Sequence, residues 1–298
     1  FEEAGDYTFT VTETKSGIAG VVDDTKLTRT IKVEVVDNKD GTMTATVVKA
    51  DSDNLEFTNT YVPTPTDLKG AANLEVTKYF TGRVDDEWLD DDVFTFTLEG
   101  KDEATKQAIT AGSVTLPDNA TTGITIDKDT ENYKAAFGNI TFSKAGTYKF
   151  VVKETKGDVK GVIYDTNEKT VTVVVTDNED GTLTAAVDKD NSNDLAFTNT
   201  YDPESTILEG ATNLKVTKNF TGRVNDEWLD GDKFEFTLAG GDEATLKAIE
   251  GGNVELPNPA TLTIDKNTAD HAKAFGDITF KKAGNYTFTV TESASGLA

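Results

Sequence analysis

The sequence predicts an all-β protein built from tandem β-sandwich domains. Short runs rich in β-branched and aromatic residues alternate between polar and apolar positions with a period of two, which is the period of a strand. The clearest of these runs lie at residues 30–36, 94–98, 170–176 and 234–238. Long stretches of sequence also recur after about 140 residues, a period that matches a whole domain and exceeds that of solenoid repeats. Together the two observations predict a row of similar β domains.

The repeat divides the chain into one complete and two partial domains. Residues 142–154 match residues 1–13 upstream and residues 280–292 downstream. We expect the C-terminal part of a repeat at 1–61, a complete repeat at 62–201 and the N-terminal part of the next repeat at 202–298. The chain therefore reads as a window from a longer array. In the alternative interpretation, residues 1–61 of one chain complete residues 202–298 of another, although the strand sequence shared by both ends argues against it.

Turn and cap residues predict the smaller elements. Glycine-bearing turns at 37–41 and 177–181 indicate hairpins with a bulge. Two-turn helices are expected at 102–109 and 242–249, each with an aspartate as N-cap. Proline-containing linkers at 62–67 and 202–206 restrict the backbone between repeats. The array should therefore behave as a semi-rigid rod.

Composition excludes several classes of function. The 298 residues include no cysteine, so disulfides, thiolate metal sites and cysteine nucleophiles are ruled out. The formal net charge is −24 and no basic stripe exists, so we expect no nucleic-acid partner. No apolar run reaches 18 residues, so we expect no membrane insertion in this segment. An acidic surface of this kind keeps a long array of domains soluble and self-repelling.

Three polar residues stand at positions of strands that face the apolar core. Lys78 alternates with Leu74, Val76 and Phe80, and Glu154 and Asn199 alternate with apolar residues in the same way. Burying an unpaired charge costs several kcal/mol or forces the group to become neutral. The coincidence therefore calls for one shared site.

The same residue types recur in the partial repeats. Lys218 and Asn59 each lie 140 residues from Lys78 and Asn199, and Glu13 and Glu292 are the counterparts of Glu154. The first partial repeat thus holds Glu13 with Asn59, and the last holds Lys218 with Glu292. We expect their missing partners to lie beyond this window.

These strands resemble the isopeptide-forming pilin and adhesin repeats of Gram-positive bacteria, which are related to the immunoglobulin-like B-type domains of collagen adhesins. The resemblance rests on the Val-Thr-Lys strand ending at Lys78, the Val-x-Glu strand ending at Glu154 and the strand Phe-Thr-Asn-Thr-Tyr around Asn199. It implies that the Lys78 amine attacks the Asn199 carboxamide, forming an amide and releasing ammonia.

The chemistry of burial fits that reaction. An apolar site favours a neutral amine at Lys78 and a protonated acid at Glu154. Glu154 is expected to polarise the Asn199 carbonyl and to shuttle protons. The reaction happens once, so the chain would not be an enzyme with turnover. The competing interpretation is a buried Lys–Glu ion pair beside a hydrogen-bonded asparagine.

The expected function is therefore structural: the stalk or fibre of a bacterial cell-surface adhesin or pilus, located outside the cell or anchored to its wall. Its partners would be neighbouring repeats and other copies in a filament, and no cofactor is expected. A ligand-binding adhesin module and a filament subunit that assembles head-to-tail remain the alternatives.

Other features carry weaker hypotheses. Carboxylates gather at residues 85–92 and 226–232, but they lack the spacing of a calcium loop, so we expect solvated loops and no metal. Trp88 and Trp228 recur with the repeat and are expected to anchor packing. His271 has no sequence partners that suggest catalysis.

Overall fold

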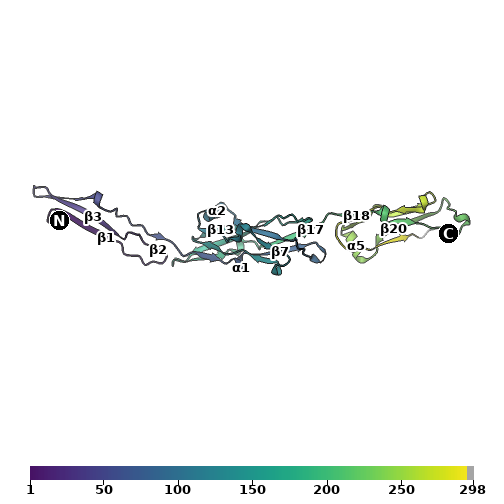
Figure 1. Ribbon diagram of the computed structural model, residues 1–298, viewed down its shortest axis with the longest axis horizontal. Helices are drawn as coiled ribbons and strands as arrows, with labels where there is room; N and C mark the ends of the chain where they lie inside the picture. The colour runs from purple at the N-terminus through teal and green to yellow at the C-terminus, as the bar shows by residue number, and fades with distance from the viewer. Residues whose placement is uncertain (294–298) are drawn as a thin grey trace.

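The computed structural model describes residues 1–293 as an elongated row of three units (Figure 1). We call them the first unit (strands β1–β5), the central domain (β6–β17) and the third unit (β18–β25). Residues 294–298, the end of the expected third repeat, lie outside the described part. The first unit lies at one end of the row and the third unit at the other (Figure 1).

The central domain is a sandwich of two main sheets. A five-stranded sheet has the order β10-β8-β13-β15-β16, and a four-stranded sheet has the order β11-β7-β17-β14. A smaller sheet, β6-β12-β9, lies beside them. The strands are β6 (Thr66–Leu68), β7 (Glu75–Thr81), β8 (Phe94–Gly100), β9 (Val114–Thr115), β10 (Ile124–Ile126), β11 (Lys134–Ala136), β12 (Ile140–Phe142), β13 (Gly146–Thr155), β14 (Val162–Ile163), β15 (Lys169–Asp177), β16 (Leu183–Val187) and β17 (Ala196–Tyr201).

The strand pairing brings the first and last long strands of the central domain together. β17 pairs with β7 in parallel, with Phe197 opposite Lys78, whereas the other strand pairs of this domain are antiparallel. Because parallel neighbours run in the same direction, the chain enters β7 at one end of the domain and leaves β17 at the other.

Alternating side chains fill the space between the two main sheets. Phe94 and Phe96 of β8 are fully buried, as are Val76 of β7 and Phe197 of β17. The rings of Phe96 and Phe197 lie 5.0 Å apart between centroids. The predicted inward faces of these strands are therefore confirmed.

The two predicted helices are present as α2 (Glu103–Thr110) and α5 (Glu243–Glu250). Asp102 caps the first by accepting from the Thr105 backbone N–H at 2.9 Å, and Asp242 caps the second in the same way. Single-turn helices are α1 (Gly70–Asn73), α3 (Asn119–Thr122) and α4 (Gly210–Asn213). Short 3-10 turns are η1 (Lys49–Asp51), η2 (Val84–Asp86), η3 (Glu131–Tyr133), η4 (Lys189–Asn191), η5 (Val224–Asp226) and η6 (Ala269–His271).

The first and third units repeat the two ends of the central domain. In the first unit, β1-β3-β4 and β2-β5 reproduce the pairings of β13-β15-β16 and β14-β17. In the third unit, β22-β20-β25, β19-β23 and β18-β24-β21 reproduce those of β10-β8-β13, β7-β11 and β6-β12-β9. The prediction of tandem β domains is thereby confirmed.

The strands of these units are β1 (Gly5–Thr12), β2 (Val21–Val22), β3 (Thr28–Asp37), β4 (Met43–Val47), β5 (Thr60–Tyr61), β18 (Thr206–Leu208), β19 (Lys215–Thr217), β20 (Lys233–Gly240), β21 (Val254–Glu255), β22 (Thr261–Asp265), β23 (Ala272–Ala274), β24 (Ile278–Phe280) and β25 (Phe288–Glu292).

The joint between the first unit and the central domain uses a hairpin turn of the central domain. The Tyr61 hydroxyl donates to the Asp177 carboxylate at 2.9 Å, and the Thr64 N–H donates to the Gly181 carbonyl at 2.8 Å. Gly181 has a φ of 82°, and a Cβ there would lie 2.7 Å from the Gly20 nitrogen. Only glycine fits this close approach.

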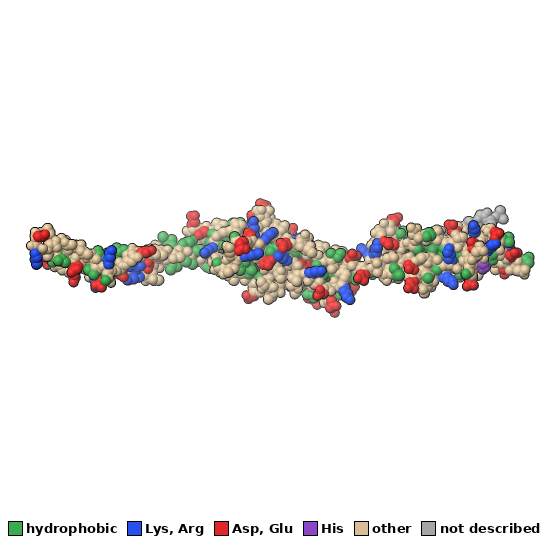
Figure 2. All heavy atoms as spheres, turned by 90° about the horizontal axis from the view of Figure 1, so that it is seen from above, with side chains coloured by type: hydrophobic (Ala, Val, Ile, Leu, Met, Phe, Trp, Pro, Cys, Tyr) green, Lys and Arg blue, Asp and Glu red, His purple; other side chains and the backbone are tan. Residues whose placement is uncertain are grey.

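Charged side chains are spread along the surface of the row (Figure 2). Acidic side chains outnumber basic ones, 53 to 29. Within residues 1–293, no helix is both long and apolar enough to cross a membrane.

Candidate functional site

The amine of Lys78 is buried in the core of the central domain. Lys78 lies in the middle of β7, where inward positions alternate with outward ones, and it is 1% exposed. Its Nζ lies 4.7 Å from the centre of the Phe94 ring and 5.8 Å from that of Phe96. The nitrogen donates to Glu154 Oε2 at 2.7 Å. The lysine that the strand pattern predicted to face the core does so.

Glu154 connects two nitrogens from the facing sheet. It stands next to the last residue of β13, and its side chain is fully buried. One carboxylate oxygen accepts from Lys78 Nζ, and the other accepts from Asn199 Nδ2 at 2.5 Å. Asn199, in β17, is also fully buried. The structure thus brings together the three residues singled out in the sequence.

Burial moves both titrating groups toward their neutral forms. Desolvation lowers the pKa of Lys78 to about 8, against the opposing effect of the Glu154 carboxylate. Desolvation likewise raises the pKa of Glu154, against the opposing effect of the Lys78 ammonium. A proton can therefore pass from Lys78 to Glu154 at a smaller cost than in water, which leaves a nucleophilic amine beside an acid.

The hydrogen-bond partner of the Asn199 carbonyl differs from the one that we expected. We expected Glu154 to polarise this carbonyl, but Glu154 meets the amide nitrogen instead. The carbonyl oxygen accepts from the Asp165 backbone N–H at 2.7 Å. Asp165 escaped the sequence analysis because it lies in a loop after β14, where no alternation indicates which way a group points.

The first unit contains the glutamate and the asparagine of the site. Asn59 Nδ2 donates to Glu13 Oε1 at 2.6 Å, and the Asp24 N–H donates to Asn59 Oδ1 at 2.8 Å. Glu13 Oε2, the counterpart of the oxygen that accepts from Lys78, is buried and has no hydrogen-bond partner among the described residues.

The third unit contains the lysine and the glutamate. Lys218 Nζ lies 2.7 Å from Glu292 Oε1 and 4.3 Å from the centre of the Phe234 ring. The two side chains are 19% and 37% exposed, whereas those of Lys78 and Glu154 are fully buried. The Lys218–Glu292 pair is therefore more exposed to solvent than its counterpart in the central domain.

Comparison with known families gives a match over most of the chain. A family model described as FctA, a Spy0128-like isopeptide-containing domain, matches residues 1–62, 74–202 and 214–298. The chain belongs to this family. No curated protein sequence matches it.

Similar solved structures include major pilins of Streptococcus pyogenes. The T-13 pilin is 18% identical, with a TM-score of 0.30, and the match covers 78% of this chain and 84% of that one. The T3.2 pilin is 20% identical, with a TM-score of 0.27 and coverage of 77% and 84%. A third major pilin is 18% identical, with a TM-score of 0.30 and coverage of 74% and 81%.

The acidic loop of the central domain, residues 85–92, is only partly solvated, which corrects our expectation. Asp92 is fully buried, where it pairs with Arg83 and accepts from the Leu89 N–H at 2.6 Å. Asp232 is buried in the same way with Arg223 in the third unit. No cluster of potential metal ligands occurs within the described residues.

The two tryptophans pack against aromatic rings, as predicted. Trp88 stacks on Tyr133 with centroids 4.4 Å apart and meets Phe80 edge-on. Trp228 stacks on His271 at 4.0 Å, so the histidine takes the place of the tyrosine.

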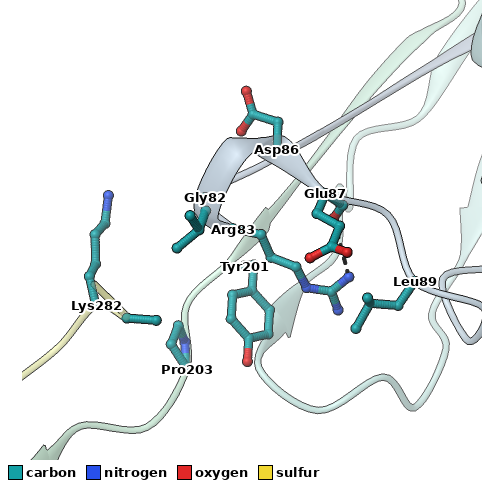
Figure 3. Close-up of a pocket in the computed structure, with 10 residues that line it drawn as sticks. Gly82, Arg83, Asp86, Glu87, Leu89, Tyr201, Pro203 and Lys282 are labelled. Carbon is teal, nitrogen blue, oxygen red and sulfur yellow. Dashed lines mark hydrogen bonds between the residues drawn. The ribbon is translucent and has the colours of Figure 1, made fainter. Parts of the chain in front are cut away.

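An open cleft lies where the central domain meets the third unit (Figure 3). Arg83, Tyr201 and Pro203 line it from the central side, and Lys282 lines it from the other (Figure 3). The Gly82 φ of 99° and its close approach to the Tyr201 backbone require a residue without a Cβ. The cleft belongs to the joint between the two units.

Proposed function

We propose that this chain is part of a bacterial surface fibre, a pilus or adhesin stalk, whose repeats are each locked by an intramolecular Lys–Asn isopeptide bond. In the central domain the bond joins Lys78 to Asn199. The observation that carries the proposal is the buried Glu154 carboxylate, which holds the Lys78 nitrogen and the Asn199 amide nitrogen on its two oxygens. Membership of an isopeptide-containing family supports it.

The geometry supports a defined sequence of proton transfers. Glu154 takes a proton from the Lys78 ammonium, and the neutral amine attacks Asn199 Cγ. The protonated Glu154 then gives its proton to the amide nitrogen and receives one from the new C–N nitrogen. The bond from Cγ to the amide nitrogen breaks, and ammonia leaves. Folding holds the reacting groups together, so the step is intramolecular.

The position of the bond suits a fibre under tension. Lys78 lies on β7 and Asn199 on β17, the parallel neighbours through which the chain enters and leaves the domain. Pulling the two ends apart would slide these strands past each other. A bond between them carries the load before the hydrogen bonds of the sheet separate.

The test is the intact mass of the full 298-residue chain. Bond formation in the central domain should lower the mass by about 17 Da, one ammonia. Lys78→Ala, Glu154→Ala and Asn199→Ala should each show the full mass. Proteolytic mapping should recover one branched peptide containing residues 78 and 199, because trypsin does not cleave after an acylated lysine.

Lys153→Ala is a matched control for this test. Lys153 is the neighbour of Glu154 on β13, but its side chain points outward and pairs with Glu99 and Glu168. This variant should lose ammonia as the parent does. A parent chain at full mass would overturn the proposal and leave Lys78 and Glu154 as a buried ion pair.

A second candidate is head-to-tail assembly of chains, and the observation that favours it is the buried Glu13 Oε2, which has no hydrogen-bond partner among the described residues. The first unit lacks a lysine for Glu13 and Asn59, and the third unit lacks an asparagine for Lys218 and Glu292 among the described residues. A covalent Lys218–Asn59 bond between copies would give denaturant-resistant oligomers that Lys218→Ala abolishes. Monomers alone at high protein concentration would argue against this candidate.

A further inference from the structure

A backbone N–H of the central domain is aimed at the carbonyl of the reacting asparagine. The Asp165 N–H donates to Asn199 Oδ1 at 2.7 Å. The orientation of the side-chain amide follows from its neighbours, because a backbone N–H can only donate and the Glu154 carboxylate accepts. The oxygen of Asn199 therefore faces Asp165, and its nitrogen faces Glu154.

The Asp165 carboxylate holds both its own loop and the strand that carries Asn199. Oδ1 accepts from the Asn167 backbone N–H at 2.9 Å and from its side-chain nitrogen at 2.7 Å, which closes a tight turn. Oδ2 accepts from the Thr198 N–H at 3.1 Å. Thr198 immediately precedes Asn199, so one side chain fixes the donor loop relative to the acceptor strand.

The first unit repeats this arrangement with its own residues. The Asp24 N–H donates to Asn59 Oδ1 at 2.8 Å. The Asp24 carboxylate accepts from the Lys26 N–H at 2.8 Å and from the Thr58 N–H at 2.9 Å. Thr58 precedes Asn59 as Thr198 precedes Asn199. The same hydrogen bonds form in the first unit although it lacks the counterparts of strands β6–β12. They therefore depend on the loop and the asparagine strand, and not on the rest of the core.

We propose that Asp165 is a further functional residue of the isopeptide reaction, with two roles. Its backbone N–H stabilises the negative charge that develops on Asn199 Oδ1, and its carboxylate positions that N–H by holding Thr198. This inference rests on the proposed function of the site.

Asp165 and Glu154 have different tasks in the reaction: Asp165 stabilises negative charge and Glu154 transfers protons. When the Lys78 nitrogen bonds to Asn199 Cγ, the π electrons of the carbonyl move onto Oδ1, where the Asp165 N–H receives the charge. When the bond from Cγ to the amide nitrogen breaks, these electrons re-form the carbonyl and ammonia leaves. Glu154 moves the protons, and Asp165 exchanges none.

The test compares rates of ammonia loss in the full chain after rapid refolding from denaturant. Asp165→Ala removes the hydrogen bond from the Thr198 N–H to the Asp165 carboxylate and should slow the reaction by about 10-fold or more. Complete loss of an oxyanion donor typically slows a reaction by about 10²–10³-fold, which sets the upper limit. Asp165→Asn keeps an acceptor oxygen and should stay within about 3-fold of the parent. Asp127→Ala is the control, because Asp127 begins a similar turn after β10 in which its carboxylate accepts hydrogen bonds from Asp129 and Thr130. This variant should react at the parent rate.

Two readouts separate this role from a merely structural one. The Asp165 charge raises the pKa of both Lys78 and Glu154, so Asp165→Ala and Asp165→Asn should both move the pH of the highest rate downward. Both limbs of the pH profile should remain, because Asp165 transfers no proton, and only Asp165→Ala should lower the maximal rate. In the unreactive Lys78→Ala chain, nuclear magnetic resonance should detect a scalar coupling across the hydrogen bond between the Asp165 nitrogen and Asn199 Cγ, and Asp165→Ala should weaken it.

The outcomes distinguish this inference from the function on which it rests. A parent chain that never loses ammonia overturns both. A reactive parent together with a folded Asp165→Ala chain that reacts at the parent rate overturns the role of Asp165 alone. If Asp165→Ala does not fold, absence of the coupling in Lys78→Ala overturns the inference by itself.

Discussion

At the scale of single residues, Lys78 and Glu154 behave as one acid–base unit. Their nitrogen and oxygen lie 2.7 Å apart in a site that excludes water, and burial favours the neutral form of each. In the proposed reaction, the reactive form of the pair holds one transferable proton, on Glu154, with a neutral amine on Lys78. A second proton blocks the nucleophile, and removal of the proton takes away the acid that the leaving nitrogen needs.

This pairing predicts a bell-shaped dependence of the reaction rate on pH. The rate should fall above about pH 8, where the pair loses its proton, because the pKa of Lys78 is lowered to about 8. It should also fall in acid, below the raised pKa of Glu154, because Lys78 and Glu154 then both hold protons. The measurement is the rate of mass loss after refolding across this pH range.

Two results bear on the prediction in different ways. The chain kept in denaturant should not react at any pH, which controls for chemistry outside the folded site. A rate that keeps rising to pH 10 would show that Lys78 needs only to be deprotonated and that Glu154 supplies no proton to the leaving nitrogen.

Strand alternation was enough to predict the buried residues of the site. The period of two placed Lys78, Glu154 and Asn199 on inward faces, and the structure agrees. The same pattern could not reveal Asp165 or the orientation of the Asn199 amide. Both depend on the path of the loop between β14 and β15, and hydrogen bonds from a loop backbone leave no periodic trace in sequence.

At the scale of elements, the loop between β7 and β8 is held by a buried ion pair. The Arg83 guanidinium binds the Asp92 carboxylate through two nitrogens and lies between the rings of Phe80 and Tyr201, at 4.9 and 4.8 Å. Tyr201 ends the last strand of the domain, so the loop, the core and the exit strand meet at one arginine. The sequence showed only a run of carboxylates in this loop. Arg83 and Asp92 lie nine positions apart, and no sequence pattern indicates that the loop folds back to bring them together.

Removing the carboxylate should destabilise the central domain strongly. We expect Asp92→Ala to lower its free energy of unfolding by about 3–5 kcal/mol, because the Arg83 charge would remain partly buried without its partner. Denaturation followed by tryptophan fluorescence measures this, in a Trp228→Phe chain so that only Trp88 reports. The same chain also carries Lys78→Ala, which prevents the proposed isopeptide bond from forming. The stability that the bond would add then cannot hide the effect of Asp92→Ala.

The third unit offers the matched comparison. Asp232→Ala removes the corresponding carboxylate, but Arg223 is 36% exposed whereas Arg83 is 11% exposed. The effect on the third unit, followed with Trp228 in a Trp88→Phe chain, should therefore be smaller. Equal losses at both sites would contradict the idea that burial sets the cost.

Most regular elements could be predicted, and their pairing could not. The alternating runs became β3, β8, β15 and β20, and the aspartate caps marked α2 and α5 correctly. The parallel pairing of β7 with β17 joins residues more than a hundred positions apart. Local periodicity carries no information about such a partner, although the shared chemistry of Lys78 and Asn199 indicated that the two strands meet.

At the scale of the whole molecule, a force that pulls on the two ends would pass through each unit in turn. The three units form a row, and the joint to the first unit is pinned by hydrogen bonds from Tyr61 and Thr64 to one hairpin of the central domain (Figure 1). The proposed bond also shortens the unfolded chain. Closing a loop of about 120 residues would add up to roughly 4–5 kcal/mol of stability by analogy with a disulfide.

Pulling on single molecules tests this load path directly. In the parent chain, force applied at the two ends should extend the central domain very little, because the bond bypasses the residues between 78 and 199. The Lys78→Ala chain should release about 400 Å of additional length when the domain unfolds, the extended span of about 120 residues. Extensions assigned to the first and third units should be the same in both chains, which provides the internal control. Equal total extension of parent and variant would mean that no covalent bond joins β7 to β17, and that the hydrogen bonds between these parallel strands carry the load alone.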